Sequence, residues 1–161
     1  MVSNFFAGST YYTGPILTDG MVRQAEAQLG VRLPRAYVSL LRERNGGEPR
    51  NRCFPTRFPT SWAVDHFCIE GVFGIGDYPW GIDSELGSRY LAEEWGYPHV
   101  GVIFCSTSFE HDAVMFDYTQ GEDLEEPPVV YIDRDRKPRR VARSFNEFIE
   151  GLRSCDEFDD D

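Results

Sequence analysis

The stretch LPRAYVSLLRERNGGEP, residues 33–49, holds one amphipathic helix with a marked beginning and a marked end. Pro34 suits the first turn of a helix, where its missing N–H has no partner to lose. Three apolar side chains then share one helical face: Tyr37, Leu40 and Leu41. Residues that favour left-handed backbone follow at the C-terminal end: Asn45, Gly46 and Gly47. This short helix, followed by a long strand-like and acidic stretch, predicts a fold that mixes helices with a sheet.

Three other segments show helical spacing. Residues 18–30 begin at a capping Thr18 or Asp19, place Met21, Val22, Ala25 and Leu29 on one face, and stop at Gly30. Residues 84–96 predict a helix that ends at Gly96, with three side chains facing inward: Leu86, Tyr90 and Leu91. Ser144 and Glu147 form a capping-box pattern ahead of an apolar i, i+3, i+4, i+7 series that starts at Phe145.

Four apolar runs have the length of strands: residues 66–76, 100–106, 113–118 and 129–133. Short connections such as 107–112 favour antiparallel pairing. The sequence therefore predicts an α+β fold, with a mainly antiparallel β-sheet flanked by helices. The length of 161 residues suits a single domain, 1–161, with a core at about 18–153, an N-terminal extension at 1–17 and an acidic tail at 154–161.

The net charge of −11 is concentrated in the middle of the chain. Residues 65–126 hold fourteen Asp or Glu against Arg89 alone, whereas residues 32–57 are net positive. Phosphate is repelled by such a surface, so direct nucleic-acid binding and binding to an anionic membrane are not expected. A basic protein partner, by contrast, is attracted to such a surface. The alternative is that the charge serves only solubility.

The four cysteines favour a reducing compartment. Cys53, Cys68, Cys105 and Cys155 form no Cys-x-x-Cys pair, so we expect reduced, mostly buried thiols. No apolar run reaches the roughly 18–20 residues that span a bilayer. The N-terminal stretch lacks the features of a secretory signal. The expected location is the cytoplasm.

No catalytic, cofactor or metal site is expected. His66, His99 and His111 are too far apart for a local metal motif. Cys105 with His111 is a candidate nucleophile pair, but Cys105 lies in an apolar strand, where a core thiol is the simpler interpretation. The loop GVFGIGDYPWG, residues 71–81, lacks the lysine and glycine order of a phosphate-binding loop. Carboxylate pairs lie on polar stretches typical of solvated charge.

The loops do combine acids with aromatic rings, which is typical of a protein-binding surface. If several loops meet at one end of the sheet, the partner-binding residues are Asp77, Tyr78, Trp80, Asp83, Glu110, Asp112, Glu122, Asp123 and Glu125. The alternative for Tyr78 and Trp80 is ordinary packing inside the fold.

An ordered set of motifs resembles the SUKH superfamily, the Smi/Knr-type domain, in its bacterial immunity-protein branch. The motifs are Leu33-Pro34-x-x-Tyr37-x-x-x-Leu41 running into Asn45-Gly46-Gly47-Glu48, then Val102-Ile103-Phe104-Cys105, His111 to Tyr118, Glu126 to Asp133, and Ser144-Phe145-x-x-Phe148-Ile149. The resemblance covers about residues 18–153. One departure is Glu110-His111-Asp112, where many members have a Gly-Gly-Asp turn.

The resemblance implies a non-enzymatic immunity protein of bacterial polymorphic or contact-dependent toxin systems, one that binds a cognate toxin domain, often a nuclease. Fungal relatives act as regulatory scaffolds, so a scaffold of the cell-wall-synthesis regulator type is the alternative. A small hydrolase using Cys105 or carboxylates is a third hypothesis. No binding residue follows from the resemblance, because the partner surface varies among members. Oligomeric state and toxin identity are not predicted.

Overall fold

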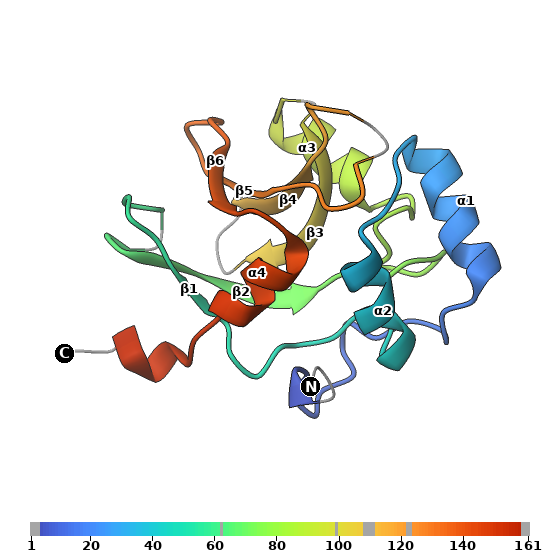
Figure 1. The fold of residues 1–161 in the computed structure, drawn as a ribbon, viewed down its shortest axis with the longest axis horizontal. Helices are drawn as coiled ribbons and strands as arrows, with labels where there is room; N and C mark the ends of the chain where they lie inside the picture. The colour runs from blue at the N-terminus through green and yellow to red at the C-terminus, as the bar shows by residue number, and fades with distance from the viewer. Residues whose placement is uncertain (1–3, 62, 99, 108–111, 122–123, 159–161) are drawn as a thin grey trace.

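The computed structural model describes residues 4–61, 63–98, 100–107, 112–121 and 124–158. The elements in chain order are α1 (Asp19–Leu29), α2 (Arg35–Glu43), β1 (Cys53–Pro55), β2 (His66–Val72), α3 (Ser88–Trp95), β3 (Gly101–Thr107), β4 (Ala113–Asp117), β5 (Val129–Ile132), β6 (Arg139–Ala142), α4 (Phe145–Gly151) and η2 (Cys155–Phe158), a 3-10 helix. The predicted α+β class is confirmed (Figure 1).

The six strands form one antiparallel sheet in the order β1-β2-β3-β4-β5-β6, so every strand pairs with its neighbour in sequence. The register shifts between Ile69 and Gly71 and again between Ile103 and Cys105. Such irregularities bend a strand and increase its twist. The sheet is accordingly curled in Figure 1, with α4 lying across it and α1 set well to one side.

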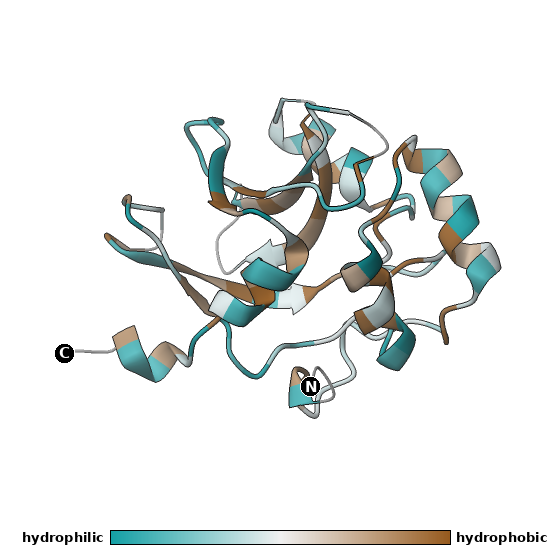
Figure 2. Ribbon diagram, in the orientation of Figure 1, coloured by the Kyte–Doolittle hydropathy of each residue, from teal (hydrophilic) through white to brown (hydrophobic). Residues whose placement is uncertain are grey.

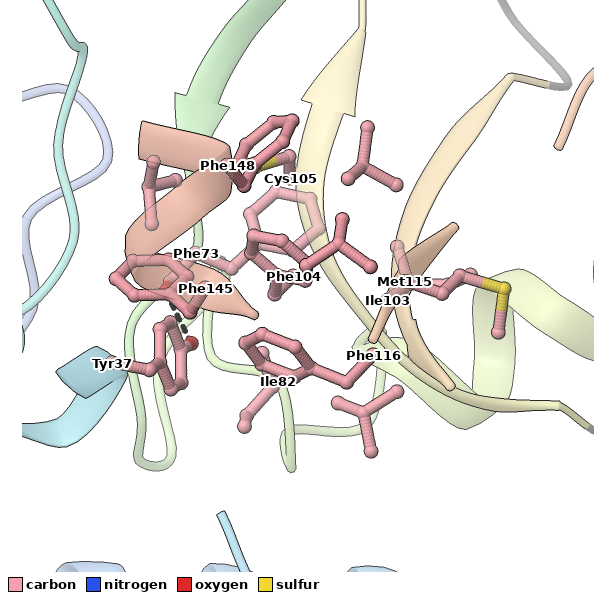
Figure 3. Packing of buried hydrophobic residues seen from close by; sticks show 14 of the residues in the cluster. Tyr37, Phe73, Ile82, Ile103, Phe104, Cys105, Met115, Phe116, Phe145 and Phe148 are labelled. Carbon is pink, nitrogen blue, oxygen red and sulfur yellow. Dashed lines mark hydrogen bonds between the residues drawn. The ribbon is translucent and has the colours of Figure 1, made fainter. Parts of the chain in front are cut away.

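An aromatic core fills the space between α2, α4 and the sheet. Phe104 and Phe116 stack at 4.0 Å between ring centroids, and Phe145 from α4 meets both rings edge-on (Figure 3). Tyr37 completes this cluster and donates its hydroxyl hydrogen to the Phe73 carbonyl at 2.6 Å. Figure 2 shows apolar residues along the strands and hydrophilic ones along the β5–β6 connection. The apolar face predicted for residues 33–49 is therefore confirmed.

Local end signals mostly act as predicted. The Thr18 side chain accepts from the Met21 amide at 3.2 Å, and Gly30 ends α1 in the left-handed conformation. Gly96 ends α3 in the same way. The Ser144 side chain caps α4 by accepting from the Glu147 amide. Cap chemistry is local in sequence, which is why these ends were predictable.

The end of α2 differs from the prediction in one respect. Only Gly46 has a positive φ there, at 95°, whereas Asn45 does not. A Cβ atom at Gly46 would lie 2.6 Å from the Tyr12 carbonyl oxygen, so both backbone angle and space require glycine. Asn45 is instead buried, and its side chain bonds to backbone groups elsewhere in the chain.

Two other expectations were wrong. Helix α3 begins only at Ser88, so Leu86 precedes it and is 57% exposed, and Tyr90 is 42% exposed instead of facing inward. Cys53 and Cys155 are joined by a disulfide and are not reduced thiols, because residues after α4 return to pair with β1. Cys105 is a buried thiol as expected. Every helix in the described ranges is too short or too polar to cross a bilayer.

Candidate protein-binding surface

The segment between β2 and α3 forms a closed loop held by its own backbone. Gly74 accepts from the Ile82 amide at 2.9 Å and donates to the Trp80 carbonyl at 3.2 Å. Gly76, inside the loop, has a φ of 127°, which favours glycine. The loop therefore presents residues 77–80 at its tip in a defined conformation.

Asn45 fastens this loop to the end of α2. Its Nδ2 atom donates to the carbonyls of Ile75 and Pro15, each at 2.8 Å, and its Oδ1 atom accepts from the Ile75 amide at 2.8 Å. A buried amide that satisfies three backbone groups fixes the position of its neighbours. Asn45, which belongs to the stretch 33–49, thus helps to position Ile75, thirty residues later in the chain.

Tyr78 has the same supporting role. Its hydroxyl lies 2.8 Å from the Tyr12 carbonyl oxygen and accepts from the Gly74 amide at 3.0 Å. Burial raises the pKa of Tyr78, which keeps the hydroxyl protonated and able to donate. The predicted role of Tyr78 as an interface anchor is therefore replaced by the packing alternative, because its polar end is engaged inside the molecule.

Asp77 and Asp83 lie on one side of this loop, where they line a groove against α1. The groove has a volume of about 660 Å³, and α1 contributes Met21, Gln24 and Gln28 to its wall. Glu85 and Arg89 line it too. Asp83 accepts from the Gly76 amide at 2.8 Å, whereas Asp77 and Glu85 are exposed. None of the ion pairs found in the described ranges involves these three acids.

An apolar groove of about 500 Å³ lies on the other side of the same segment. Its lining includes five large apolar side chains: Trp80, Leu86, Tyr90, Leu91 and Trp95. Trp80 is half-buried and packs against Tyr12, with 4.9 Å between ring centroids, and against Phe73. Residues 76–91 therefore carry acidic groups on one side and an apolar hollow on the other. We call these residues the two-sided segment.

The rest of the predicted set lies elsewhere. Asp112 is only 2% exposed and accepts a hydrogen bond from the Tyr131 hydroxyl at 2.5 Å, so its placement on a binding surface was wrong. Burial raises the pKa of Asp112. Glu125 is exposed and pairs with Arg32 at 3.7 Å. The predicted residues Glu110, Glu122 and Asp123 lie outside the described residues.

The sequence prediction missed Glu85, Leu86 and Tyr90 as parts of a surface. Leu86 and Tyr90 matched the helical spacing of an inward face, but α3 begins after Leu86, and its buried residues are Ser88 and Ala92. The available sequence signal was the pair Glu85-Leu86, an acid next to an apolar residue, shortly before the helix begins.

The chemistry expected of a Cys105 nucleophile is not favoured. Cys105 is 1% exposed, and burial raises the pKa of its thiol well above the usual value. Nucleophilic cysteines need a lowered pKa and access to substrate. Cys105, the main candidate nucleophile of the hydrolase hypothesis, is therefore not suited to that role.

Comparison with known protein families identifies a match. A family model, SMI1 / KNR4 family (SUKH-1), matches residues 16–151. No curated protein and no solved structure gives a significant match.

Proposed function

Because the chain belongs to the SMI1/KNR4 family (SUKH-1), we propose that it is a non-catalytic immunity protein that binds a basic bacterial toxin domain of the nuclease class. In this proposal it acts in the cytoplasm and covers the toxin's phosphate-binding surface. The observation that carries the proposal is the two-sided segment, whose acids lack arginine partners in the described ranges and whose other side is an open apolar groove.

The charge of the segment suits such a partner. A nuclease presents positive charge to the phosphates of its substrate, so a negatively charged protein competes for the same surface. Complementary charge also speeds encounter, toward about 10⁸–10⁹ M⁻¹s⁻¹ at low salt. Asp77, Asp83 and Glu85 supply that charge from one groove.

The apolar side supplies affinity. Interface energy is concentrated in a few apolar or aromatic side chains that become fully desolvated on binding. Leu86 and Tyr90 are exposed and line the apolar groove, so they lose the most water when a partner covers it. Trp80 is already half-buried and lines the same groove.

The function is tested by co-expressing the chain with the toxin domain encoded beside its gene and counting surviving cells. We expect the chain to restore survival. Death at the rate seen without the chain contradicts the immunity role. Binding to a protein other than a toxin, with no protection, favours the scaffold role of the family instead.

The location of the surface is tested with Leu86→Ser and a matched control, Val64→Ser. Both side chains are large, apolar and exposed, at 57% and 79%, but Val64 lies in the β1–β2 connection. We expect Leu86→Ser to weaken toxin binding about 10-fold to 100-fold and Val64→Ser to leave it unchanged, as measured by calorimetry. Equal effects place the interface elsewhere.

A further inference from the structure

Three potential metal ligands meet on one face of the β1–β2 pair. Cys53 lies directly opposite Cys68 in the antiparallel register, and His66 lies two residues before Cys68 on the same strand. Alternate residues of a strand point to the same face, so the three side chains converge. One ligand atom from each lies within 4.8 Å of the others, and all three residues are buried.

A fourth ligand comes from the far end of the chain. After α4, Arg153 exchanges two backbone hydrogen bonds with Cys53, at 3.1 and 2.7 Å, and this places Cys155 over the same face. Cys155 forms the disulfide with Cys53, and its sulfur lies 3.4 Å from the Cys68 sulfur. Three cysteines and one histidine therefore occupy a single corner, which we call the cysteine corner.

We propose that the cysteine corner binds one zinc ion when the Cys53–Cys155 disulfide is reduced. A dithiol reductant transfers two electrons and two protons to the disulfide, which yields two thiols and an oxidised dithiol. Zinc then replaces the three thiol protons of Cys53, Cys68 and Cys155, and His66 donates a nitrogen lone pair. Three thiolates and an imidazole form a closed tetrahedral set of the structural Cys₃His type.

The observed spacing is close to what zinc requires. With Zn–S bonds of about 2.3 Å, neighbouring ligands of a tetrahedron lie about 3.8 Å apart. The Cys68 and Cys155 sulfurs are at 3.4 Å, and the cluster of Cys53, His66 and Cys68 lies inside 4.8 Å. The largest change is at Cys53 and Cys155, which have to move apart from the roughly 2.0 Å of a disulfide. Cys155 begins the short η2 helix, which has no buried residue.

The surroundings of His66 support a metal ligand. Its Nδ1 atom lies 2.9 Å from the Asp65 carboxylate, so we assign the metal bond to Nε2. A carboxylate on the second ring nitrogen is the usual device that orients a zinc-binding histidine. Phe158 stacks on the imidazole at 4.2 Å between centroids and covers it. Thiolate and imidazole ligands select zinc over magnesium or calcium, which prefer oxygen.

The proposal is tested on the full chain reduced with a phosphine, since added thiols compete for the metal. After zinc is added and unbound metal is removed by gel filtration, native mass spectrometry counts the ions that remain. We expect one zinc per reduced chain and none per oxidised chain. With cobalt, we expect the thiolate charge-transfer absorption of a tetrahedral site. A reduced chain that retains no zinc overturns the proposal.

Two variants and a control separate binding from folding. Cys68→Ala leaves the disulfide pair intact and should abolish zinc retention, whereas Cys105→Ala removes a buried thiol outside the corner and should retain it. Asp65→Asn changes an exposed residue and should weaken zinc binding about 10-fold to 100-fold. Full zinc retention by Cys68→Ala, or unchanged affinity in Asp65→Asn, contradicts the assignment.

Discussion

Two groups of acids in this chain lie in acidic, loop-like segments of the sequence, but the structure surrounds them differently. The groove acids are Asp77, Asp83 and Glu85, which line the groove beside α1. The sheet-end acids are Asp112, Asp133 and Asp135, which lie where β4 begins and where β5 ends. Arg139 contacts both Asp133, at 3.9 Å, and Asp135, at 2.5 Å, and Asp112 is buried against Tyr131.

The difference shows why net charge alone does not locate a binding surface. A carboxylate paired with a nearby arginine contributes little to the field that a distant partner experiences, whereas unpaired carboxylates in a groove reinforce one another. Asp83 accepts from the Gly76 amide, and no ion pair within the described parts of the chain involves the groove acids, so their charge is not cancelled there by a bonded arginine. The sheet-end acids are instead engaged by Arg139 or by the Tyr131 hydroxyl, and the following predictions test this division.

The largest expected effect comes from replacing Asn45, which holds the loop that carries groove acids. Asn45→Ala leaves the buried backbone groups of Ile75 and the Pro15 carbonyl without their partner. Each unsatisfied buried group costs roughly 1–3 kcal/mol, and partial relaxation reduces the sum, so we expect a loss of about 2–4 kcal/mol. Urea unfolding measures it. Asn146→Ala, at an exposed position of α4, is the control and should cost less than about 0.5 kcal/mol.

The next effect concerns the charge of the groove. The double substitution Asp77→Asn with Glu85→Gln should slow association with the toxin domain about tenfold at low salt and flatten its salt dependence. Stopped-flow fluorescence measures the rate. The control, Glu43→Gln with Glu150→Gln, removes the same charge from exposed positions on α2 and α4. If both pairs slow association equally, only net charge matters and the groove has no special role.

The parts of the fold that were predictable depend on neighbours in sequence. The capping of α1 by Thr18 and of α4 by Ser144 involves residues three positions apart, so the pattern alone contains the information. Strands β1 and β6 have three and four residues and were missed, because such short strands exist only through pairing with a neighbour. The same reason explains the disulfide, whose cysteines are 102 positions apart.

The site was only partly predictable. Asp77 and Asp83 were identified from the acidic, glycine-rich loop, and the structure places both in one groove. Asp112 is also an acid that was predicted to lie in a loop, yet it directly precedes Ala113, which pairs with Ile132, and it is only 2% exposed. Which acid becomes buried depends on register between distant strands, and one sequence does not reveal that register.

Asp112 should give a pH dependence with an unusual sign. Burial raises its pKa above the unfolded value of about 3.9, so the folded state holds the proton more tightly. Its stabilising contribution is complete below the unfolded pKa and is lost as pH rises through the folded pKa. Relative to Asp112→Asn, the wild-type chain should therefore lose free energy of unfolding between acidic and neutral pH. Urea unfolding of both chains across that range measures the difference, and a constant difference contradicts the burial of a charge.

The smallest effect is expected at Arg139. The hydrogen bond from Arg139 lowers the pKa of Asp135. This pair therefore stabilises the fold above the unfolded pKa of Asp135, and the stabilisation is lost as pH falls through the folded pKa. The direction is the reverse of that at Asp112. Both side chains are about one-third exposed, and exposed pairs contribute at most about 1 kcal/mol. Arg139→Gln should therefore cost less than about 1 kcal/mol at neutral pH and less in acid, where only contacts such as that with the Phe58 ring remain, with Arg140→Gln as the exposed neighbouring control. A larger cost than that of Asn45→Ala would mean that the sheet-end acids, and not the supports of the groove, hold the fold together.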